Sequence, residues 1–218
     1  ASVELDTVHR FSDPEYAALT LRLRNPRDRD EALSVAGELL RRGHVQRVAS
    51  TDEAREAMVA AYFDWHARGK RVALVSGSNG EADAINDAIQ QRRVDEGELD
   101  PTTLALGMGE QCILVGDTVQ TRRNDPRTGV ENRAQWMVRN ISDGSIDLAS
   151  VSDSGEIRRV SRDYALDHLQ LAYASTVHGI QGETTDAAVV GPDVDAAGLY
   201  VGLTRGRHQN IAVTIART

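Results

Sequence analysis

Residues 173–186, YASTVHGIQGETTD, offer the widest choice of polar chemistry in the chain. Thr176, His178 and Gln181 bring a hydroxyl, an imidazole and an amide, and each of these groups forms hydrogen bonds readily. The glycines between them let a ligand come close to the backbone, because no Cβ stands in the way. This composition is typical of a binding loop, and a polar turn with a helix cap is the structural alternative.

Residues 198–207, GLYVGLTRGR, place an arginine at the end of an apolar, helix-like segment. Arg205 is followed by Gly206, so its side chain is well placed to reach out of the fold. A guanidinium group is planar and permanently charged, which suits bidentate recognition of phosphate. The alternative is that Arg205 only satisfies the dipole at the helix end.

Other kinds of active site find little support in the residues. A hydrolytic triad of Ser175, His178 and Asp186 is disfavoured, because no G-x-S-x-G elbow is present and residues so close in sequence rarely converge. Lys70 is the single lysine and lies in WHARGKR, so the chain has no G-x-x-x-x-G-K-[ST] phosphate loop. Cys112 is the single cysteine and the six histidines lack ligand-like spacing, so no metal site is expected.

The elements that must position these residues follow an α/β order. The chain has 218 residues, of which 40% are hydrophobic, enough for a sizeable core. The apolar run RVALVS, the turn GSNG and a following helix form a strand–turn–helix sequence. Further helices are predicted from Ser12 as an N-cap, over 28–42, and from Thr51 as an N-cap to Gly69.

The middle of the chain has a different pattern. Short alternating segments, separated by turn signals, predict a small antiparallel β-barrel. We therefore expect one α/β domain over 1–115 and 166–218, with the barrel inserted at 116–165. The segment 95–111 is predicted to be a flexible loop.

Charge restricts how the chain can meet nucleic acid. The net charge of −8 argues against coating by bulk positive charge, so any contact must be local. Arg122, Arg123, Arg127 and Arg133 form the basic concentration of the barrel, either a patch that follows a nucleic-acid backbone or a solvated turn. Trp136 either stacks on a base or belongs to the core.

The chain shows no sign of membrane insertion or secretion. Its apolar runs stay well short of the roughly 20 residues that a membrane span needs, and no leader is visible, so a cytoplasmic location is expected. The first residue is Ala1 and not methionine, which indicates a processed product or a piece of something longer.

Taken together, the motifs resemble those of superfamily 1 DNA helicases. A strand followed by TVHGIQGET and then LYVGLTRGR resembles motifs V and VI, TVHRF resembles motif IV, and VALVSGSNGEADAIN resembles the strand–loop–helix that follows. The inserted module resembles the SH3-like barrel of RecD-like, superfamily 1B helicases. The resemblance is closest to the helicase part of MobF/TraA-type conjugative relaxases of actinobacterial type, and it covers nearly the whole chain.

The resemblance implies a fold and a division of labour. The fold would be the second RecA-like motor domain, and the absent first half would supply the Walker A loop, the carboxylate that binds Mg²⁺ and the catalytic Glu for ATP hydrolysis. Arg10 and Arg205 would reach the γ-phosphate of ATP as arginine fingers, a role in which charge stabilises the transferring phosphoryl group. Gly182 and Glu183 would lie against the nucleotide.

The same resemblance assigns a DNA path. Single-stranded DNA would be held by residues of the motifs and of the barrel, namely Ser76, Thr176, His178, Gln181, Arg122 and Arg123. The partners of the chain would be single-stranded DNA and the motor and relaxase domains that precede it in the same polypeptide. This chain alone would be inactive as an ATPase.

Two departures from the family pattern bear on these roles. Gly179 stands where the family more often has a lysine, and Thr184 stands where many members have a glutamate, with Glu183 one place earlier. Two other functions stay open: an inactive nucleic-acid-binding or assembly module, and a fragment of a RecD-like repair helicase.

Overall fold

The structure is a computed structural model, which describes residues 11, 13–151, 153, 155–180 and 184–216. The chain divides into two compact units, one of Ala1–Ala82 with Ser175–Thr218 and the other of Asp83–Ala174. The insertion expected at 116–165 lies wholly inside the second unit, and its exact boundaries stay a prediction.

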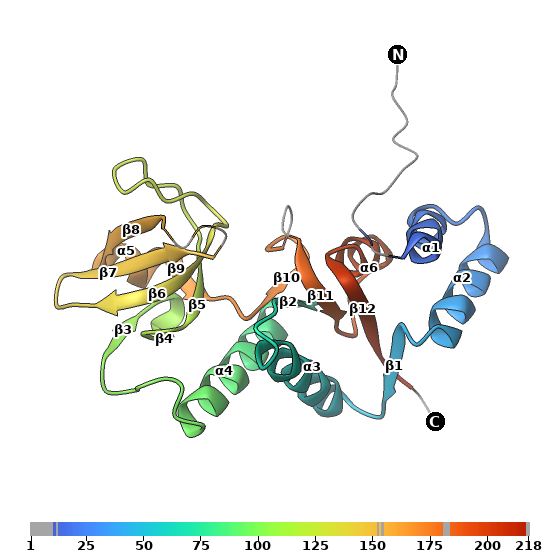
Figure 1. Ribbon diagram of the computed structural model, residues 1–218, viewed down its shortest axis with the longest axis horizontal. Coiled ribbons are helices and arrows are strands. Elements are labelled where there is room, and N and C mark those ends of the chain that lie inside the picture. The colour runs from blue at the N-terminus through green and yellow to red at the C-terminus, as the bar shows by residue number, and fades with distance from the viewer. Residues whose placement is uncertain (1–10, 12, 152, 154, 181–183, 217–218) are drawn as a thin grey trace, which may run out of the picture. The chain divides into compact units, whose positions relative to one another are not determined.

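A mainly parallel sheet of five strands organises the first unit (Figure 1). The strand order is β1-β12-β11-β2-β10, and β11 pairs in parallel with both β12 and β2. The strands are β1 Val45–Val48, β2 Val72–Ser76, β10 Ala174–Thr176, β11 Thr185–Val190 and β12 Gly206–Ile215. The predicted α/β class is confirmed, because long apolar runs such as VALVS and DAAVV are buried as central strands.

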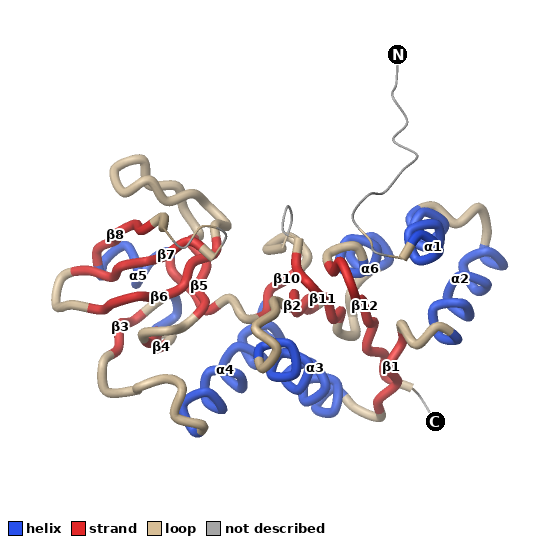
Figure 2. Tube along the Cα trace, viewed as in Figure 1, coloured by secondary structure: helices blue, strands red, loops and turns tan. Residues whose placement is uncertain are grey.

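Helices pack against this sheet (Figure 2). The helices of the first unit are α1 Pro14–Arg24, α2 Arg29–Arg41, α3 Thr51–His66 and α6 Ala196–Leu203, and α4 Asn79–Asp95 begins in this unit and continues into the second. The N-caps differ from two predictions. Asp13 caps α1 by accepting from the backbone N–H groups of Glu15 and Tyr16, while Ser12 lies outside the described residues. Ser50 caps α3 in place of Thr51, which is the first helical residue.

The core of the first unit forms between the sheet, α6 and the α1–α2 pair. Val75 on β2, Val190 on β11 and Leu203 on α6 are all fully buried in one cluster with residues of α1 and α2. Tyr16 fastens α1 to α6, because its hydroxyl donates to the Leu203 carbonyl oxygen at 2.8 Å. Burial raises the pKa of that hydroxyl well above its usual range.

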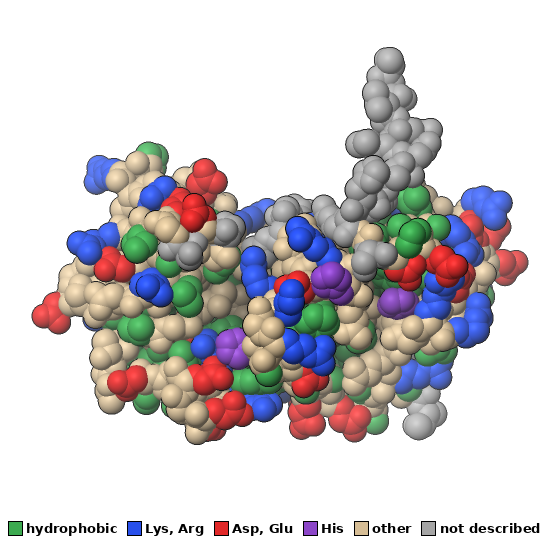
Figure 3. Space-filling view, viewed as in Figure 1, with side chains coloured by type: hydrophobic (Ala, Val, Ile, Leu, Met, Phe, Trp, Pro, Cys, Tyr) green, Lys and Arg blue, Asp and Glu red, His purple; other side chains and the backbone are tan. Residues whose placement is uncertain are grey.

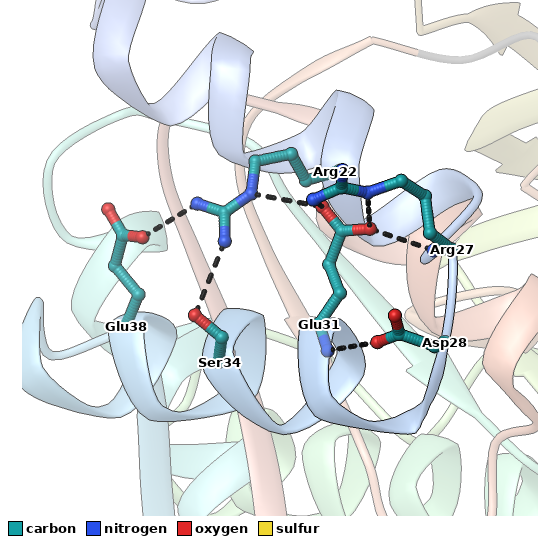
Figure 4. Close-up of polar contacts among 6 residues, drawn as sticks. All are labelled: Arg22, Arg27, Asp28, Glu31, Ser34 and Glu38. Atoms are coloured by element: carbon teal, nitrogen blue, oxygen red, sulfur yellow. Dashed lines mark hydrogen bonds and ion pairs between the residues drawn. The ribbon is translucent and has the colours of Figure 1, made fainter.

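Ion pairs join α1 to α2 at the surface (Figure 4). Arg22 on α1 lies 3.0 Å from a carboxylate oxygen of Glu38 and 3.7 Å from one of Glu31, both on α2. Arg27, between the helices, also contacts Glu31, and its hydrogen bonds lower the pKa of that carboxyl. Because Arg27 is exposed and Arg22 partly so, water screens these ion pairs, and they orient the helical pair more than they stabilise it.

The second unit contains the predicted antiparallel sheet. Its strand order is β8-β7-β6-β5-β9, and a hairpin of β3 and β4 lies beside a short helix, α5. The bounds are β3 Leu104–Leu106, β4 Cys112–Leu114, β5 Thr118–Thr121, β6 Gln135–Ile141, β7 Ser145–Ser150, β8 Ile157–Ser161, α5 Arg162–His168 and β9 Leu169–Leu171. The sheet includes β9, which pairs with β5 and lies past residue 165.

Two features of this unit correct or decide sequence predictions. The segment 95–111 is not simply a loop, because it forms β3 and a turn of 3₁₀ helix at Met108–Glu110, fixed by the pairing of β3 with β4. Trp136 is 3% exposed, so it belongs to the core and does not offer a face to a base. Its indole N–H donates to the Thr121 hydroxyl, which satisfies the one polar atom of the ring.

Candidate nucleic-acid interface

A cavity of about 350 Å³ opens in the first unit at the carboxyl end of β2. It brings together three residues that the sequence assigned to DNA: Ser76, Thr176 and His178. Its wall is completed by the loop before α6 and by the first turns of that helix, so the described lining is Ser76, Gly77, Thr176, Val177, His178, Asp193, Val194, Asp195, Ala197, Gly198 and Val201. Gln181, the fourth residue predicted near this point, lies outside the described residues.

The floor of the cavity depends on a close contact between two loops. Ser76 ends β2, and its hydroxyl donates to the Ser78 carbonyl oxygen at 3.1 Å, which turns the chain toward α4. A Cβ on Gly77 would lie 2.5 Å from the Asp193 carbonyl oxygen, so only glycine allows this approach. Asp193 itself has φ +65°, a left-handed conformation that aspartate tolerates better than most residues.

The polar groups in the lining are used in different ways. The Asp195 carboxylate caps α6 by accepting from the Gly198 N–H at 2.7 Å. The side chains of Thr176, half-buried, and of His178 and Asp193, both exposed, make no hydrogen bond or ion pair with the described residues. Unengaged polar groups that converge on a cavity are the usual mark of a binding site.

Sequence reasoning missed Asp193 and Asp195. The available signal was the pattern P-D-x-D directly before an apolar helix, which predicts a turn and an N-cap. The pattern does not reveal that this turn meets the loop after β2, because the two loops are far apart in sequence and meet only through the sheet.

The packing of Ser175 against Gly179 explains why position 179 carries a glycine and not the lysine that the resemblance leads one to expect. Ser175 is buried, and its hydroxyl has no hydrogen-bond partner among the described residues. A Cβ on Gly179 would lie 2.9 Å from both Cβ and Oγ of Ser175, so a lysine there would require the Ser175 segment to move. The absence of a side chain at this position is therefore built into the local packing.

The triad of Ser175, His178 and Asp186 is not assembled. Asp186 lies at the start of β11, where it accepts from the Arg71 backbone N–H at 3.0 Å and pairs with Lys70 at 3.4 Å. The Arg71 N–H, with help from Lys70 and His208, lowers the pKa of the Asp186 carboxyl. This carboxylate has a structural function at the amino end of the sheet.

Arg205 lies at that same amino end, where α6 finishes and β12 begins. Its Nε donates to the Val201 carbonyl oxygen at 3.0 Å, one turn back on α6, and its own carbonyl accepts from Thr185 N–H at 3.0 Å. Arg205 as a residue is half-buried, and its side chain is anchored by its own helix. The other residues assigned to the nucleotide, Arg10, Gly182 and Glu183, lie outside the described residues.

Arg122 and Arg123 belong to the second unit, in the loop that joins β5 to β6. Both are exposed; Arg122 donates to the Gln120 side-chain oxygen at 3.2 Å, and Arg123 lies 3.4 Å from His168 Nε2. Tyr164 on α5 stabilises this loop, because its hydroxyl donates to the Arg123 carbonyl oxygen. The backbone beneath this pair of arginines is therefore fixed.

On the face drawn in Figure 3, basic and acidic side chains are interspersed and no extended field of one sign is present. Within the described ranges, no three His, Cys, Asp or Glu side chains gather in a metal-binding arrangement. No helix among the described residues is long and apolar enough to cross a membrane.

Solved structures define the class of the fold. A crystal structure of Bacteroides Pif1 bound to ssDNA superposes with a TM-score of 0.62 at 19% identity, covering 98% of this chain and 51% of that one. Pif1 helicase from Candida albicans gives a TM-score of 0.53 at 15% identity, with 94% and 54% covered. The chain therefore shares the fold of one part of these Pif1 helicases, and it spans about half of their length.

Two proteins are similar to this chain in sequence over part of its length. The multifunctional conjugation protein TraI of Escherichia coli (strain K12) is 28% identical over 158 residues, which are 69% of this chain and 8% of TraI. An uncharacterized protein of Mycobacterium tuberculosis is 32% identical over 107 residues, covering 48% of this chain and 62% of that protein. No protein-family model matches the chain.

Proposed function

We propose that this chain is the second motor domain of an ATP-dependent DNA helicase, in the helicase part of a conjugative relaxase. The observation that carries the proposal is the meeting of Ser76, Thr176 and His178 in one cavity. These residues come from two segments about one hundred residues apart in sequence, and both segments belong to the resemblance to helicase motifs. The likeness to TraI favours conjugation over repair, and the fold of Pif1 favours a motor over an unrelated binding module.

The two ends of the sheet would then have different partners. Single-stranded DNA would run past the carboxyl end of β2, where the cavity lies, and ATP would be approached from the amino end, where Arg205 lies. Arg205 and Arg10 would neutralise charge that develops on the γ-phosphate. Hydrolysis of ATP, assisted by Mg²⁺, would drive movement along the DNA. The ligands of the Mg²⁺ would come from the absent first half.

Within this proposal the inserted module at 116–165 is an SH3-like barrel that contributes to the DNA path. Its exposed Arg122 and Arg123 would contact the backbone of the strand, since arginine pairs with phosphate irrespective of sequence. The complete protein would carry the first motor domain and a relaxase domain in the same polypeptide.

The test is the binding of fluorescent single-stranded DNA, followed by anisotropy at several salt concentrations. We expect weak binding, because a net charge of −8 opposes the approach of a polyanion. The binding should fall as salt rises, because each phosphate that a basic side chain neutralises releases counterions. Thr176→Ala and His178→Ala should each weaken it several-fold. Arg41→Ala, at an exposed position on the end of α2, is the matched control and should change it little.

Three results would contradict the proposal: tight binding that is insensitive to salt, a preference for duplex DNA, or equal effects of the cavity and control substitutions. Any of them would favour the specialised binding or assembly module. A helicase of the repair type would share the DNA result, and it would differ in lacking a relaxase domain in the complete protein.

A further inference from the structure

The cavity beside His178 has a charge that does not suit a phosphate. Its described lining contains no lysine or arginine and two carboxylates, those of Asp193 and Asp195. The amino end of α6 contributes only about half a positive charge, and Asp195 already occupies it as the cap. A phosphate placed inside would therefore face net negative charge.

The volume and the lining of the cavity suit an uncharged heterocyclic group. Val177, Val194 and Val201 give it apolar walls, and a volume of about 350 Å³ is ample for one heterocyclic base. Thr176, His178 and Asp193 supply donors and acceptors that the described part of the chain does not use. This combination of apolar walls with a few unengaged polar groups is how proteins hold bases.

We propose that the cavity receives a nucleobase of the bound strand, while the phosphates on either side stay outside it, and that Asp193 accepts a hydrogen bond from the base. The proposal rests on the proposed function, since it presumes that single-stranded DNA passes this point. It makes the site selective, in contrast to a contact with the backbone, which every sequence offers equally.

The chemistry of a carboxylate sets the direction of the selectivity. An ionised carboxylate only accepts hydrogen bonds. Cytosine, adenine and guanine carry an exocyclic amino group that donates, whereas thymine carries carbonyl oxygens on both sides of its single N–H. Asp193 therefore favours bases with an amino group over thymine.

Asp193→Asn isolates this contribution. Asparagine tolerates the left-handed backbone at φ +65° as aspartate does, so the loop should keep its conformation while it loses the charge. Asp64→Asn, at an exposed position on α3, removes the same charge elsewhere on the first unit and is the matched control.

The experiment measures dissociation constants of the 218-residue chain for oligo(dC), oligo(dT) and an abasic strand, each of about 20 nucleotides, at slightly alkaline pH. We expect oligo(dC) to bind roughly fivefold more tightly than oligo(dT), with the abasic strand weakest. Asp193→Asn should bring the two pyrimidine strands close to equality, and Asp64→Asn should preserve their difference.

Equal affinity of the native chain for all three strands would overturn the base pocket and leave the proposed function standing. So would a uniform tightening on Asp193→Asn that Asp64→Asn does not share, because that result indicates a phosphate in the cavity. If the native chain binds no single strand at any salt concentration, the proposed function itself fails, and the base pocket fails with it.

Discussion

At the scale of single residues, Arg205 makes a structural contact that is compatible with the proposed role at the nucleotide. Its Nε donates to the Val201 carbonyl oxygen, which also accepts from the Thr204 hydroxyl, and this contact restricts the direction of the guanidinium. Anchoring of this kind reduces the number of conformations that an arginine must lose when it meets a charged phosphate. The structural and catalytic interpretations of this residue are therefore compatible.

In the complete motor, Arg205→Ala should lower kcat by roughly 10³, the scale of arginine fingers, with a far smaller change in nucleotide affinity. Arg205→Lys should rescue poorly, because a compact ammonium does not reproduce the planar fork. Steady-state ATPase kinetics measure the effect, and thermal unfolding of the 218-residue chain is the control. A purely structural arginine would show the reverse: a lowered Tm of the chain and nearly unchanged kcat.

At the scale of elements, a buried polar network connects α4 to the strands of the second unit. Asp117, fully buried before β5, accepts from the Tyr173 hydroxyl and from the Leu114 backbone N–H at 2.7 Å. Arg93 on α4 donates to the same Tyr173 hydroxyl at 2.8 Å and pairs with Glu98 at 2.9 Å. Because each of these buried polar groups has a partner, the network specifies how α4 meets the strands.

This network predicts a distinctive dependence of stability on pH. Burial raises the pKa of Asp117 above its ordinary value of 3.8, and the hydrogen bonds from Tyr173 and Leu114 only partly offset it. The folded chain therefore holds this proton more tightly than the unfolded chain does. The contribution of Asp117 to stability is full below the unfolded pKa and is lost as the pH rises through the folded pKa.

Asp117→Asn should remove that dependence and add a penalty that does not vary with pH, since the amide cannot replace both acceptor oxygens. Urea unfolding of both proteins at a series of pH values measures it. The stability difference in favour of the native chain should be largest below about pH 4 and should shrink as the pH rises above it. A difference that grows with pH would mean that the folded state prefers the ionised carboxylate.

At the scale of the whole molecule, the sequence predicts that the chain does not hydrolyse ATP by itself. Its single lysine, Lys70, pairs with Asp186 outside any phosphate loop, and no Walker A sequence is present. The 218-residue chain should therefore neither bind ATP tightly nor hydrolyse it, with or without single-stranded DNA. Phosphate-release assays measure this. Turnover above background that survives repurification would refute the hypothesis that the chain is one half of a motor and needs the other half to hydrolyse ATP.

Much of the architecture was already determined by the sequence alone. Apolar runs such as RVALVS, the turn signals that follow them and the switch to period-two alternation in the middle of the chain predicted an α/β fold with an antiparallel sheet inside it. These patterns succeed because the periodicity of a strand or helix depends on neighbouring residues. Caps were less certain, since Ser50 and Thr51 both have suitable hydroxyls and only the backbone conformation chooses between them.

Only the tertiary structure decided what surrounds the candidate DNA residues. The proximity of Asp193 to Thr176 and His178 arises because a parallel sheet brings together loops that follow different strands. The need for glycine at Gly77 likewise comes from a backbone more than one hundred residues away in sequence. The environment of Trp136 also depends on the neighbouring strands β5 and β7 of its sheet. Such contacts have no local signature, because the partner's position is set by topology and not by neighbouring residues.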